Sequence, residues 1–289
     1  MSAPVVVGVD GSESALHAVR WAADEAARRG AVLRLVHAVE IPTGYPPGFV
    51  DSDALRAALA EQGRSWLEQA RQAAPGLATE VVEVKAAAVP ALVKESTHAA
   101  LVVLGSRGLG GFTGLLLGST AVELAAHAHC PVVTVRGTDN GHDGPVVVGV
   151  DGTPLGEAAI AFAFHEASIR GTGLVAVHTW TDLVLEAAFA GGAAQLDFSV
   201  LAAQAEELLG ERLAGWQEKY PDVPVSRHVS RDRAASALLR HADGAQLVVV
   251  GTRGRGGFRG LLLGSTSQHL LQHAPCPVAV VRTGSSRED

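Results

Sequence analysis

Short apolar runs rich in valine alternate along this chain with longer segments whose apolar residues recur at helical spacing. The run at 5–9 is typical of a strand that is buried on both faces. The segment at 12–29 places its apolar residues on one side of a helix, with Ser12 as the predicted N-cap and Gly30 as the predicted end. The chain therefore begins with a predicted strand followed by an amphipathic helix.

The same alternation continues through the first half of the chain. Further strands are predicted at 32–39, 80–84, 100–104 and 131–136, and further helices at 51–74, 90–98 and 118–128. Alternating strands and helices with near-continuous apolar strands indicate an α/β fold, in which helices cover both faces of a doubly wound parallel sheet. In such sheets ligands bind beyond the carboxyl ends of the strands, where the strand order reverses.

The second half of the chain repeats the first. Residues 4–11 recur unchanged at 145–152, and the block 101–120 recurs at 247–266 with sixteen of its twenty positions identical. Each copy has the length of a whole domain rather than of a solenoid repeat. We therefore predict two tandem domains, at 1–137 and 145–284, joined by a loop rich in Gly and Asp at 137–144.

The repeated block carries the most informative pattern. The fourth predicted strand ends in Gly105-Ser-Arg-Gly108, and nine residues separate this turn from Gly118, Ser119 and Thr120. The first two glycines can adopt a positive φ and bring backbone amides close to a ligand. The other three residues open the last helix, whose unpaired amides and positive dipole end suit phosphate. The second copy supplies Gly251, Gly254, Gly264, Ser265 and Thr266.

Two better-known phosphate motifs do not fit this block. No Lys follows the second glycine cluster, as a Walker A loop requires. The dinucleotide-binding fingerprint does not fit either, because its glycines follow the first strand and these follow a late one. For a single copy, a flexible surface loop is the alternative interpretation. The recurrence of the block and the length of the loop favour a binding role.

Asp10 and Asp151 end the first strand of each copy and so lie at the carboxyl edge of the sheet. A carboxylate there can accept hydrogen bonds from ribose hydroxyls or help to hold a divalent cation beside phosphates. The alternative is that it caps the first helix together with the neighbouring Ser12 or Thr153. The adjacent glycine loop favours the binding role.

Histidine and cysteine also recur between the copies. His37 and His178 end the second strand, and we expect each to be a half-buried histidine with satisfied hydrogen bonds. Cys130 and Cys276 begin the last strand, where a small buried hydrophobe is expected rather than a redox sensor. The histidines near the last helix are spaced differently in the two copies, which argues against zinc.

Composition and charge narrow the function classes. The 289 residues carry a net charge of −7 and only 4% aromatic side chains, so neither a basic surface for nucleic acid nor a base-stacking platform is expected. The start of the chain lacks the basic region of a secretory signal, and no apolar run approaches the length of a membrane span. We therefore expect a soluble cytoplasmic protein with no nucleic-acid or membrane partner.

The glycine loops resemble the nucleotide-binding pattern of the universal stress protein family, G-x2-G-x9-G-(S/T). The resemblance covers almost the whole chain as two tandem domains and is similar to actinobacterial members that bind ATP. It implies two Rossmann-like domains, each with a five-stranded parallel sheet in the order 3-2-1-4-5. It also implies ATP as the ligand. Together with the position of Asp10 and Asp151, this leads us to expect magnesium or manganese held by these carboxylates beside the phosphates.

The resemblance further implies the residues of two ATP sites. In the first copy, adenine would lie near Ala38 and Leu104, ribose near Gly8 and Asp10, and the phosphates near the glycine loop. The set is Gly8, Asp10, Ala38, Leu104, Gly105, Gly108, Gly118, Ser119 and Thr120 in the first copy and Gly149, Asp151, Thr179, Val250, Gly251, Gly254, Gly264, Ser265 and Thr266 in the second. To these we add Arg107 and Arg253, which are common to both loops and either reach the phosphates or point to solvent. Arg255 and Arg259 replace Leu109 and Thr113, so the second loop is the more basic.

Two function classes that use the nucleotide follow from these residues, and an inert interaction scaffold with unoccupied loops is a third. The first is an ATP-binding regulator of stress response or growth state, with an unknown regulatory protein as partner. The alternative is a slow ATPase or nucleotidyl-transfer enzyme. Neither loop offers a matched Glu, Lys or His for catalysis, so we assign no catalytic residue and expect at most weak hydrolysis. The family often pairs its last strands, which implies a pseudo-dimer of the two domains and allows a homodimer.

Overall fold

The computed structural model describes residues 2–40, 52–109, 117–136, 143–180, 197–254 and 263–282. The chain divides into two compact units, Met1–Arg136 and Gly137–Asp289. Each unit has its own strands and helices, so each is described separately.

The first unit alternates strands and helices from end to end. Its elements are β1 (Val5–Gly8), α1 (Glu13–Arg29), β2 (Leu33–Ala38), α2 (Ser52–Gln72), β3 (Thr79–Val84), α3 (Ala88–Glu95), β4 (Leu101–Gly105), α4 (Ser119–His127) and β5 (Val132–Val135). The strands pair in parallel in the order β3-β2-β1-β4-β5. This order confirms the predicted sheet.

The second unit repeats this plan. Its elements are β6 (Val146–Gly149), a 3-10 turn η1 (Pro154–Gly156), α5 (Glu157–Arg170), β7 (Leu174–Thr179), α7 (Phe198–Lys219), β8 (Val225–Ser230), α8 (Ala234–Ala242), β9 (Leu247–Gly251), α9 (Ser265–His273) and β10 (Val278–Val281). The parallel order is β8-β7-β6-β9-β10. The predicted α/β class therefore holds for both units.

Local chemistry sets the bounds of the first helix as the sequence predicts. The Ser12 hydroxyl accepts a hydrogen bond from the amide of Ala15 at 3.1 Å and so caps the N-terminus of α1. Gly30 ends the helix in the left-handed region, with φ of 57°. The equivalent Gly171 ends α5 with φ of 62°. These caps fix the point at which the chain turns back toward the next strand.

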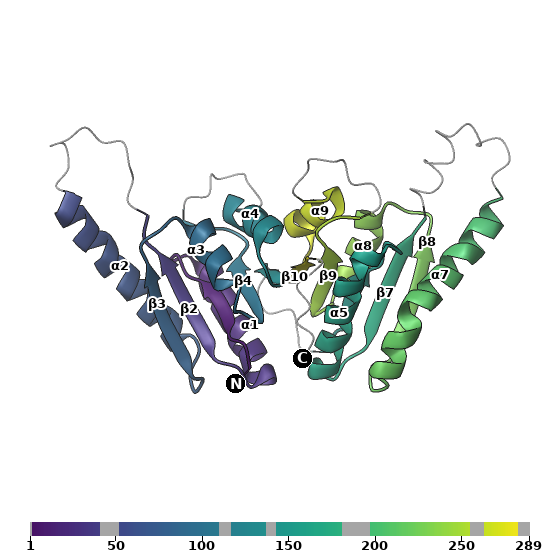
Figure 1. Ribbon diagram of the computed structural model, residues 1–289, viewed down its shortest axis with the longest axis horizontal. Helices are drawn as coiled ribbons and strands as arrows, with labels where there is room; N and C mark the ends of the chain where they lie inside the picture. The colour runs from purple at the N-terminus through teal and green to yellow at the C-terminus, as the bar shows by residue number, and fades with distance from the viewer. Residues whose placement is uncertain are drawn as a thin grey trace. The chain divides into compact units, whose positions relative to one another are not determined.

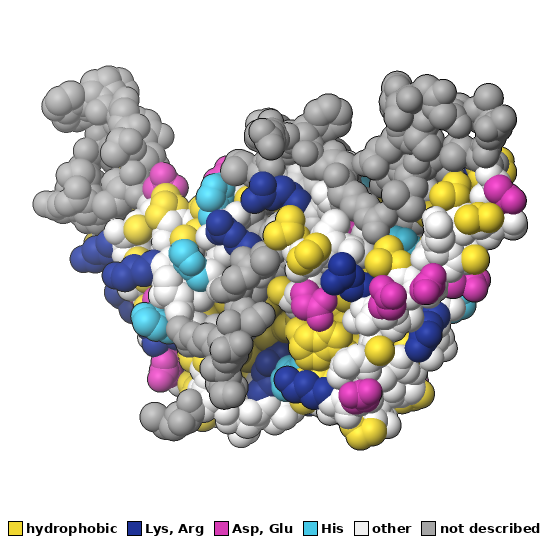
Figure 2. All heavy atoms as spheres, turned by 45° about the vertical axis from the view of Figure 1, so that its right-hand side comes forward, with side chains coloured by type: hydrophobic (Ala, Val, Ile, Leu, Met, Phe, Trp, Pro, Cys, Tyr) yellow, Lys and Arg dark blue, Asp and Glu magenta, His cyan; other side chains and the backbone are white. Residues whose placement is uncertain are grey.

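The core of each unit lies where the helices cover the central strands. The valines of β1 and β6 are fully buried, as expected for strands covered on both faces. Figure 1 shows helices on both faces of each sheet, and α3 packs against α4 as α8 packs against α9. Acidic and basic side chains are both exposed on the face shown in Figure 2. No helix among the described residues is long and apolar enough to cross a membrane.

The strand order creates one special position in each sheet. In the first unit the chain leaves β1 for β2 on one side, whereas β4 lies on the other side of β1. The connections after β1 and β4 therefore run in opposite directions and leave a crevice at the carboxyl ends of these strands. The same position in the second unit lies between β6 and β9.

A buried ion pair recurs in the helix that follows the first strand of each unit. Glu25 pairs with Arg29 at 2.6 Å and Glu166 pairs with Arg170 at 2.9 Å, and both carboxylates are fully buried. Removal of one partner from such a pair is costly because the remaining charge stays in a poorly solvated site.

We expect Arg170→Ala to lower the unfolding free energy of the second unit by about 3 kcal/mol. Arg240→Ala is the matched control, because Arg240 pairs with Asp232 in the same unit but about half of each side chain is exposed. The control should cost less than about 1 kcal/mol. Urea denaturation measures both, and equal effects would contradict the role of burial.

Both cysteines are buried, as the sequence predicts. Burial raises the pKa of the Cys276 thiol to about 12, so the native thiol stays protonated across the neutral range. The folded state holds this proton more tightly than the unfolded state does. Its contribution to stability is therefore lost as the pH rises above the ordinary thiol pKa of 9.

We expect iodoacetamide at pH 8 to leave Cys276 unmodified in the native protein, because the thiolate is the reactive form. In urea both cysteines should react. Peptide mass spectrometry measures the modification, and rapid labelling of Cys276 in the native state would contradict its burial.

Candidate functional site

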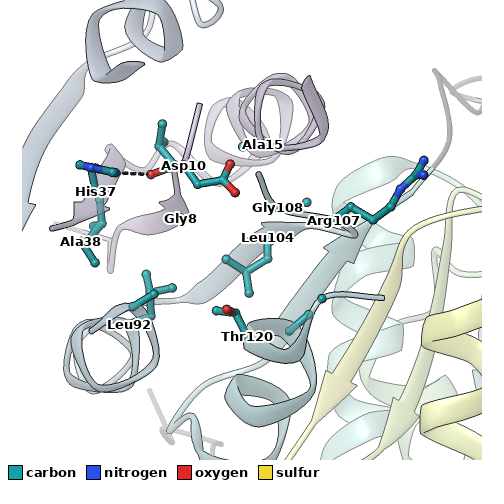
Figure 3. A pocket seen from close by; sticks show the side chains of 16 residues that line it. Gly8, Asp10, Ala15, His37, Ala38, Leu92, Leu104, Arg107, Gly108 and Thr120 are labelled. Atoms are coloured by element: carbon teal, nitrogen blue, oxygen red, sulfur yellow. Dashed lines mark hydrogen bonds between the residues drawn. The ribbon is translucent and has the colours of Figure 1, made fainter. Parts of the chain in front are cut away.

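A cavity opens at the carboxyl ends of β1, β2 and β4 in the first unit. Its empty volume, which includes the part open to solvent, is about 640 Å³. Figure 3 shows side chains from the strands, from α3 and from α4 around it. The lining residues are Gly8, Val9, Asp10, Ala15, Val36, His37, Ala38, Ala88, Leu92, Leu104, Gly105, Arg107, Gly108, Gly118, Thr120 and Ala121.

The cavity brings together nearly all of the residues predicted for the first site. Gly8, Asp10, Ala38, Leu104, Gly105, Arg107, Gly108, Gly118 and Thr120 all line it. The exception is Ser119, which is the exposed first residue of α4 and is not part of the lining. Any contribution of Ser119 to a ligand is therefore expected from its backbone amide.

Asp10 connects the turn after β1 to the loop after β4. Its Oδ1 accepts hydrogen bonds from the Ser12 amide at 3.0 Å and from the Ser12 hydroxyl at 2.7 Å. Its Oδ2 accepts one from the Leu109 amide at 3.1 Å. The bonds to Ser12 agree with the alternative prediction that Asp10 helps to cap the first helix. The bond to Leu109 adds a second part, which is to hold the glycine loop against the first helix.

The glycines of this loop are needed for a different reason from the predicted one. Among the described residues, neither Gly105 nor Gly108 has a positive φ, so that expectation is wrong. A Cβ at Gly105 would instead lie 2.6 Å from the carbonyl carbon of Ser14, and one at Gly108 would lie 2.6 Å from Oδ2 of Asp10. A side chain at Gly105 would meet the backbone of Ser14, and one at Gly108 would meet the Asp10 carboxylate that holds the loop.

The N-terminus of α4 faces the cavity without a side-chain cap. The helix begins after Gly118, which has extended backbone angles and offers no side-chain hydrogen bond to the first turn. By contrast, Ser12 caps α1. The amides of the first turn of α4 therefore lack the partner that a Ser or Asp cap would supply, and they are directed along the helix axis toward incoming anions.

The opposite end of the cavity is apolar. Leu104 and Ala38 come from the strands, and Ala88 and Leu92 come from α3. A flat aromatic ring fits such a surface, with the polar backbone at the end of β2 available at its edge. The α3 residues were not identified from the sequence, because an apolar face on a short helix looks the same whether it covers a core or a ligand.

His37 is more deeply buried than expected. Its side chain is 7% exposed, and its Nδ1 lies 2.7 Å from the carbonyl oxygen of Val9 (Figure 3). The edge of the Trp66 ring from α2 packs against it, with 5.4 Å between ring centroids. The satisfied hydrogen bond supports a structural role, with the imidazole forming part of the cavity wall.

Arg107 is one of the lining residues, but Figure 3 shows its side chain directed away from the cavity. Burial and, to a smaller extent, the nearby Arg107 guanidinium lower the pKa of Arg136. Arg107 is thus close to a second cation rather than to the centre of the cavity.

The second unit places its predicted residues in the same order. Gly149 and Gly251 end β6 and β9, and Gly264 precedes α9, again without a side-chain cap. The Oδ1 of Asp151 accepts hydrogen bonds from both the amide and the hydroxyl of Thr153 at 2.9 Å. Arg255 and Arg259, which would make this loop more basic, lie outside the described residues, as does Thr113 of the first loop.

The family comparison matches both units. The model of the universal stress protein family matches residues 1–136 and 144–282. The chain belongs to the universal stress protein family. A universal stress protein of Mycobacterium tuberculosis is 44% identical over 294 residues, covering 96% of this chain and 96% of that protein.

Two solved structures of universal stress proteins are also similar. One from Archaeoglobus fulgidus has a TM-score of 0.74 at 21% identity and covers 98% of this chain and 100% of that one, which supports the tandem fold. Another, solved in complex with cAMP, is 30% identical with a TM-score of 0.36 and covers 47% of this chain and 99% of that one.

The close approach at Gly105 gives a direct test of the site geometry in this universal stress protein. We expect Gly105→Ala to destabilise the first unit by about 1–3 kcal/mol, because the new Cβ meets the backbone of Ser14. Gly215→Ala is the control, since Gly215 lies in α7 with no heavy atom within 4 Å of the added Cβ. It should be neutral or stabilise by up to about 1 kcal/mol. Thermal unfolding distinguishes the two, and a harmless Gly105→Ala would contradict the contact.

Proposed function

We propose that this universal stress protein binds an adenine nucleotide in each unit and acts as a nucleotide-dependent regulator of stress response or growth state. The observation that carries the proposal is the uncapped, glycine-led N-terminus of α4 at one end of a cavity whose other end is apolar. An adenine nucleotide has the matching polarity, with a flat base at one end and negative phosphates at the other.

The phosphates lie at the loop and helix end of the cavity in this proposal. Gly108, Gly118 and Thr120 line that end, and Ser119 contributes its amide. No hydrogen-bond partner of the Gly108 amide is found among the described residues. An amide of this kind and the first turn of a helix together favour an anion through hydrogen bonds and the positive end of the helix dipole.

The base and the ribose occupy the rest of the cavity. Adenine rests between Leu104 and Leu92 and reaches the end of β2 at Ala38. The ribose lies beside Gly8, where a Cβ would approach the Leu104 side chain to 2.6 Å, and beside the carboxylate of Asp10. The second site uses the equivalent residues, with Thr179 and Val250 at the base and Thr266 at the phosphates.

Asp10 and Asp151 fit a magnesium or manganese ion only in company with phosphates. Within the described residues, no group of three or more His, Cys, Asp and Glu side chains is placed to hold a metal. Magnesium on nucleotides usually takes one or two carboxylates and completes its coordination with phosphates and water. Each site offers one such carboxylate.

The hydrogen bonds that the Asp10 carboxylate accepts favour regulation over catalysis. Both of its oxygens already accept hydrogen bonds from the protein, so this carboxylate couples the loop to whatever part of the ligand it contacts. A ligand that favours one arrangement of this loop would shift the balance between two surfaces presented to a partner. A slow ATPase is the competing function, and turnover with magnesium distinguishes it.

We expect the protein as purified to release ATP or ADP on acid treatment, with up to two per chain. Mass spectrometry of the supernatant identifies the nucleotide, and calorimetry on stripped protein measures its affinity. Protein without bound nucleotide and without measurable ATP affinity would contradict the proposal. Rapid multiple turnover with magnesium would favour the enzyme instead.

A charge placed at the phosphate end tests the orientation of the ligand. We expect Thr120→Asp to weaken ATP binding to the first unit by at least about tenfold, because a carboxylate would face the phosphates. It should leave the fold intact, since an acidic residue suits a helix N-terminus. Thr120→Asn has nearly the same shape without the charge and should bind ATP within about threefold of the native protein. Calorimetry that found the two variants equal would contradict this orientation.

A further inference from the structure

The glycine loop of the first unit is tied at two alternate residues to the segment 10–14, which leads into α1. The amide of Arg107 donates to the Ser14 hydroxyl at 3.3 Å, and the amide of Leu109 donates to Asp10 at 3.1 Å. Gly108, which lies between them, lines the cavity. The two bonds therefore hold the backbone on either side of the residue that is placed to meet phosphate.

The backbone at Ser14 also lies against the start of the loop. A Cβ at Gly105 would come within 2.6 Å of the carbonyl carbon, the carbonyl oxygen and the hydroxyl of Ser14. No room is left for a longer side chain or an intervening water at this contact. The Ser14 hydroxyl is thus placed against the loop by packing as well as by its hydrogen bond.

The second unit has a different residue at this position. Asp10 corresponds to Asp151 in the repeated sequence, and by the same offset Ser14 corresponds to Leu155. Leu155 is 55% exposed, and its side chain has no polar atom to accept a bond from Arg253. The residues around it form the 3-10 turn Pro154–Gly156 instead of the first turn of an α-helix. The leucine side chain at 155 therefore cannot make the hydrogen bond that the Ser14 hydroxyl makes in the first unit.

We propose that Ser14 is a positioning residue for the phosphate end of the nucleotide site in the first unit, and that the substitution of leucine at 155 makes the two sites of this chain unequal. This inference rests on the proposed function. Ser14 touches the loop rather than the ligand, so it acts by ordering the backbone before the nucleotide arrives. A loop that is already ordered loses less conformational freedom on binding, which strengthens the complex.

The proposal predicts an effect that depends on the phosphates. Adenosine contacts the apolar end of the cavity and not the loop, so its affinity should be independent of the tether. ATP uses the loop, so its affinity should fall when the tether is removed. A general defect in the fold of the first unit would weaken both ligands equally.

The test compares Ser14→Ala with Ser14→Thr, which keeps a hydroxyl, and with Leu155→Ala as the matched change in the other unit. Calorimetry on the full chain, stripped of nucleotide, is carried out with ATP and separately with adenosine. We expect Ser14→Ala to weaken ATP binding at one of the two sites by about 3–10-fold, the range of a single neutral hydrogen bond, and to leave adenosine affinity unchanged. Ser14→Thr and Leu155→Ala should both match the native protein within about twofold.

The outcomes separate this proposal from the one on which it rests. A native protein that binds no ATP would contradict the proposed function itself. A native protein that binds ATP, with a Ser14→Ala variant of equal ATP affinity, would overturn only the role of Ser14. The role of Ser14 would also be overturned if Ser14→Ala weakened adenosine binding as much as ATP binding, or if Ser14→Thr lost as much ATP affinity as Ser14→Ala.

Discussion

The close contact between the turn after β1 and the loop after β4 is the constraint on which the rest of the structure depends. It follows from the pairing of β1 with β4, in which Val5 faces Leu101 and Val7 faces Val103. Because the strands are parallel and adjacent, the segments that leave their carboxyl ends begin side by side. Helix α1 then turns back along one face of the sheet, and the loop crosses its first turn before α4 begins. The small residues of the loop allow this crossing, and the carboxylate of Asp10 holds it in place.

The two units keep this framework while other parts of them have diverged. The buried ion pair at Glu25 and Arg29 recurs at Glu166 and Arg170. The packing between the helices differs. The second unit stacks the rings of Phe164, Trp216 and Tyr220, whereas the first unit has alanine at the equivalent positions. These changes lie between α5 and α7, away from the carboxyl ends of the central strands. The glycine residues and the uncapped helix start, by contrast, are the same in both units.

Much of this could be predicted from the sequence, because it depends on local patterns. The strands and helices follow from hydrophobic periodicity, and Ser12 and Gly30 follow from helix-capping preferences. The strand order and the assignment of the ligand as ATP followed from the resemblance to a family, whereas the glycine loop and Asp10 were indicated by the pattern of residues itself. The cavity collects all of the predicted residues of the first unit except Ser119. Periodicity alone does not select one order of five parallel strands.

What could not be predicted depends on residues that are distant in the sequence. The reason for glycine at 105 is the backbone at Ser14, which is about ninety positions earlier and becomes a neighbour only when β1 and β4 pair. Leu92 gave no signal because its helix buries an apolar face in any case. Nothing in the sequence indicates that the Arg107 side chain is directed away from the cavity. Such features need the three-dimensional arrangement.

A crystal structure of the protein grown with ATP tests the central claim most directly. The account predicts a nucleotide in the first unit with its phosphates within hydrogen-bond distance of the amides of Gly108 and Thr120 and its base against Leu104. A nucleotide bound in the reverse orientation, or bound elsewhere while this cavity remains empty, would contradict the account.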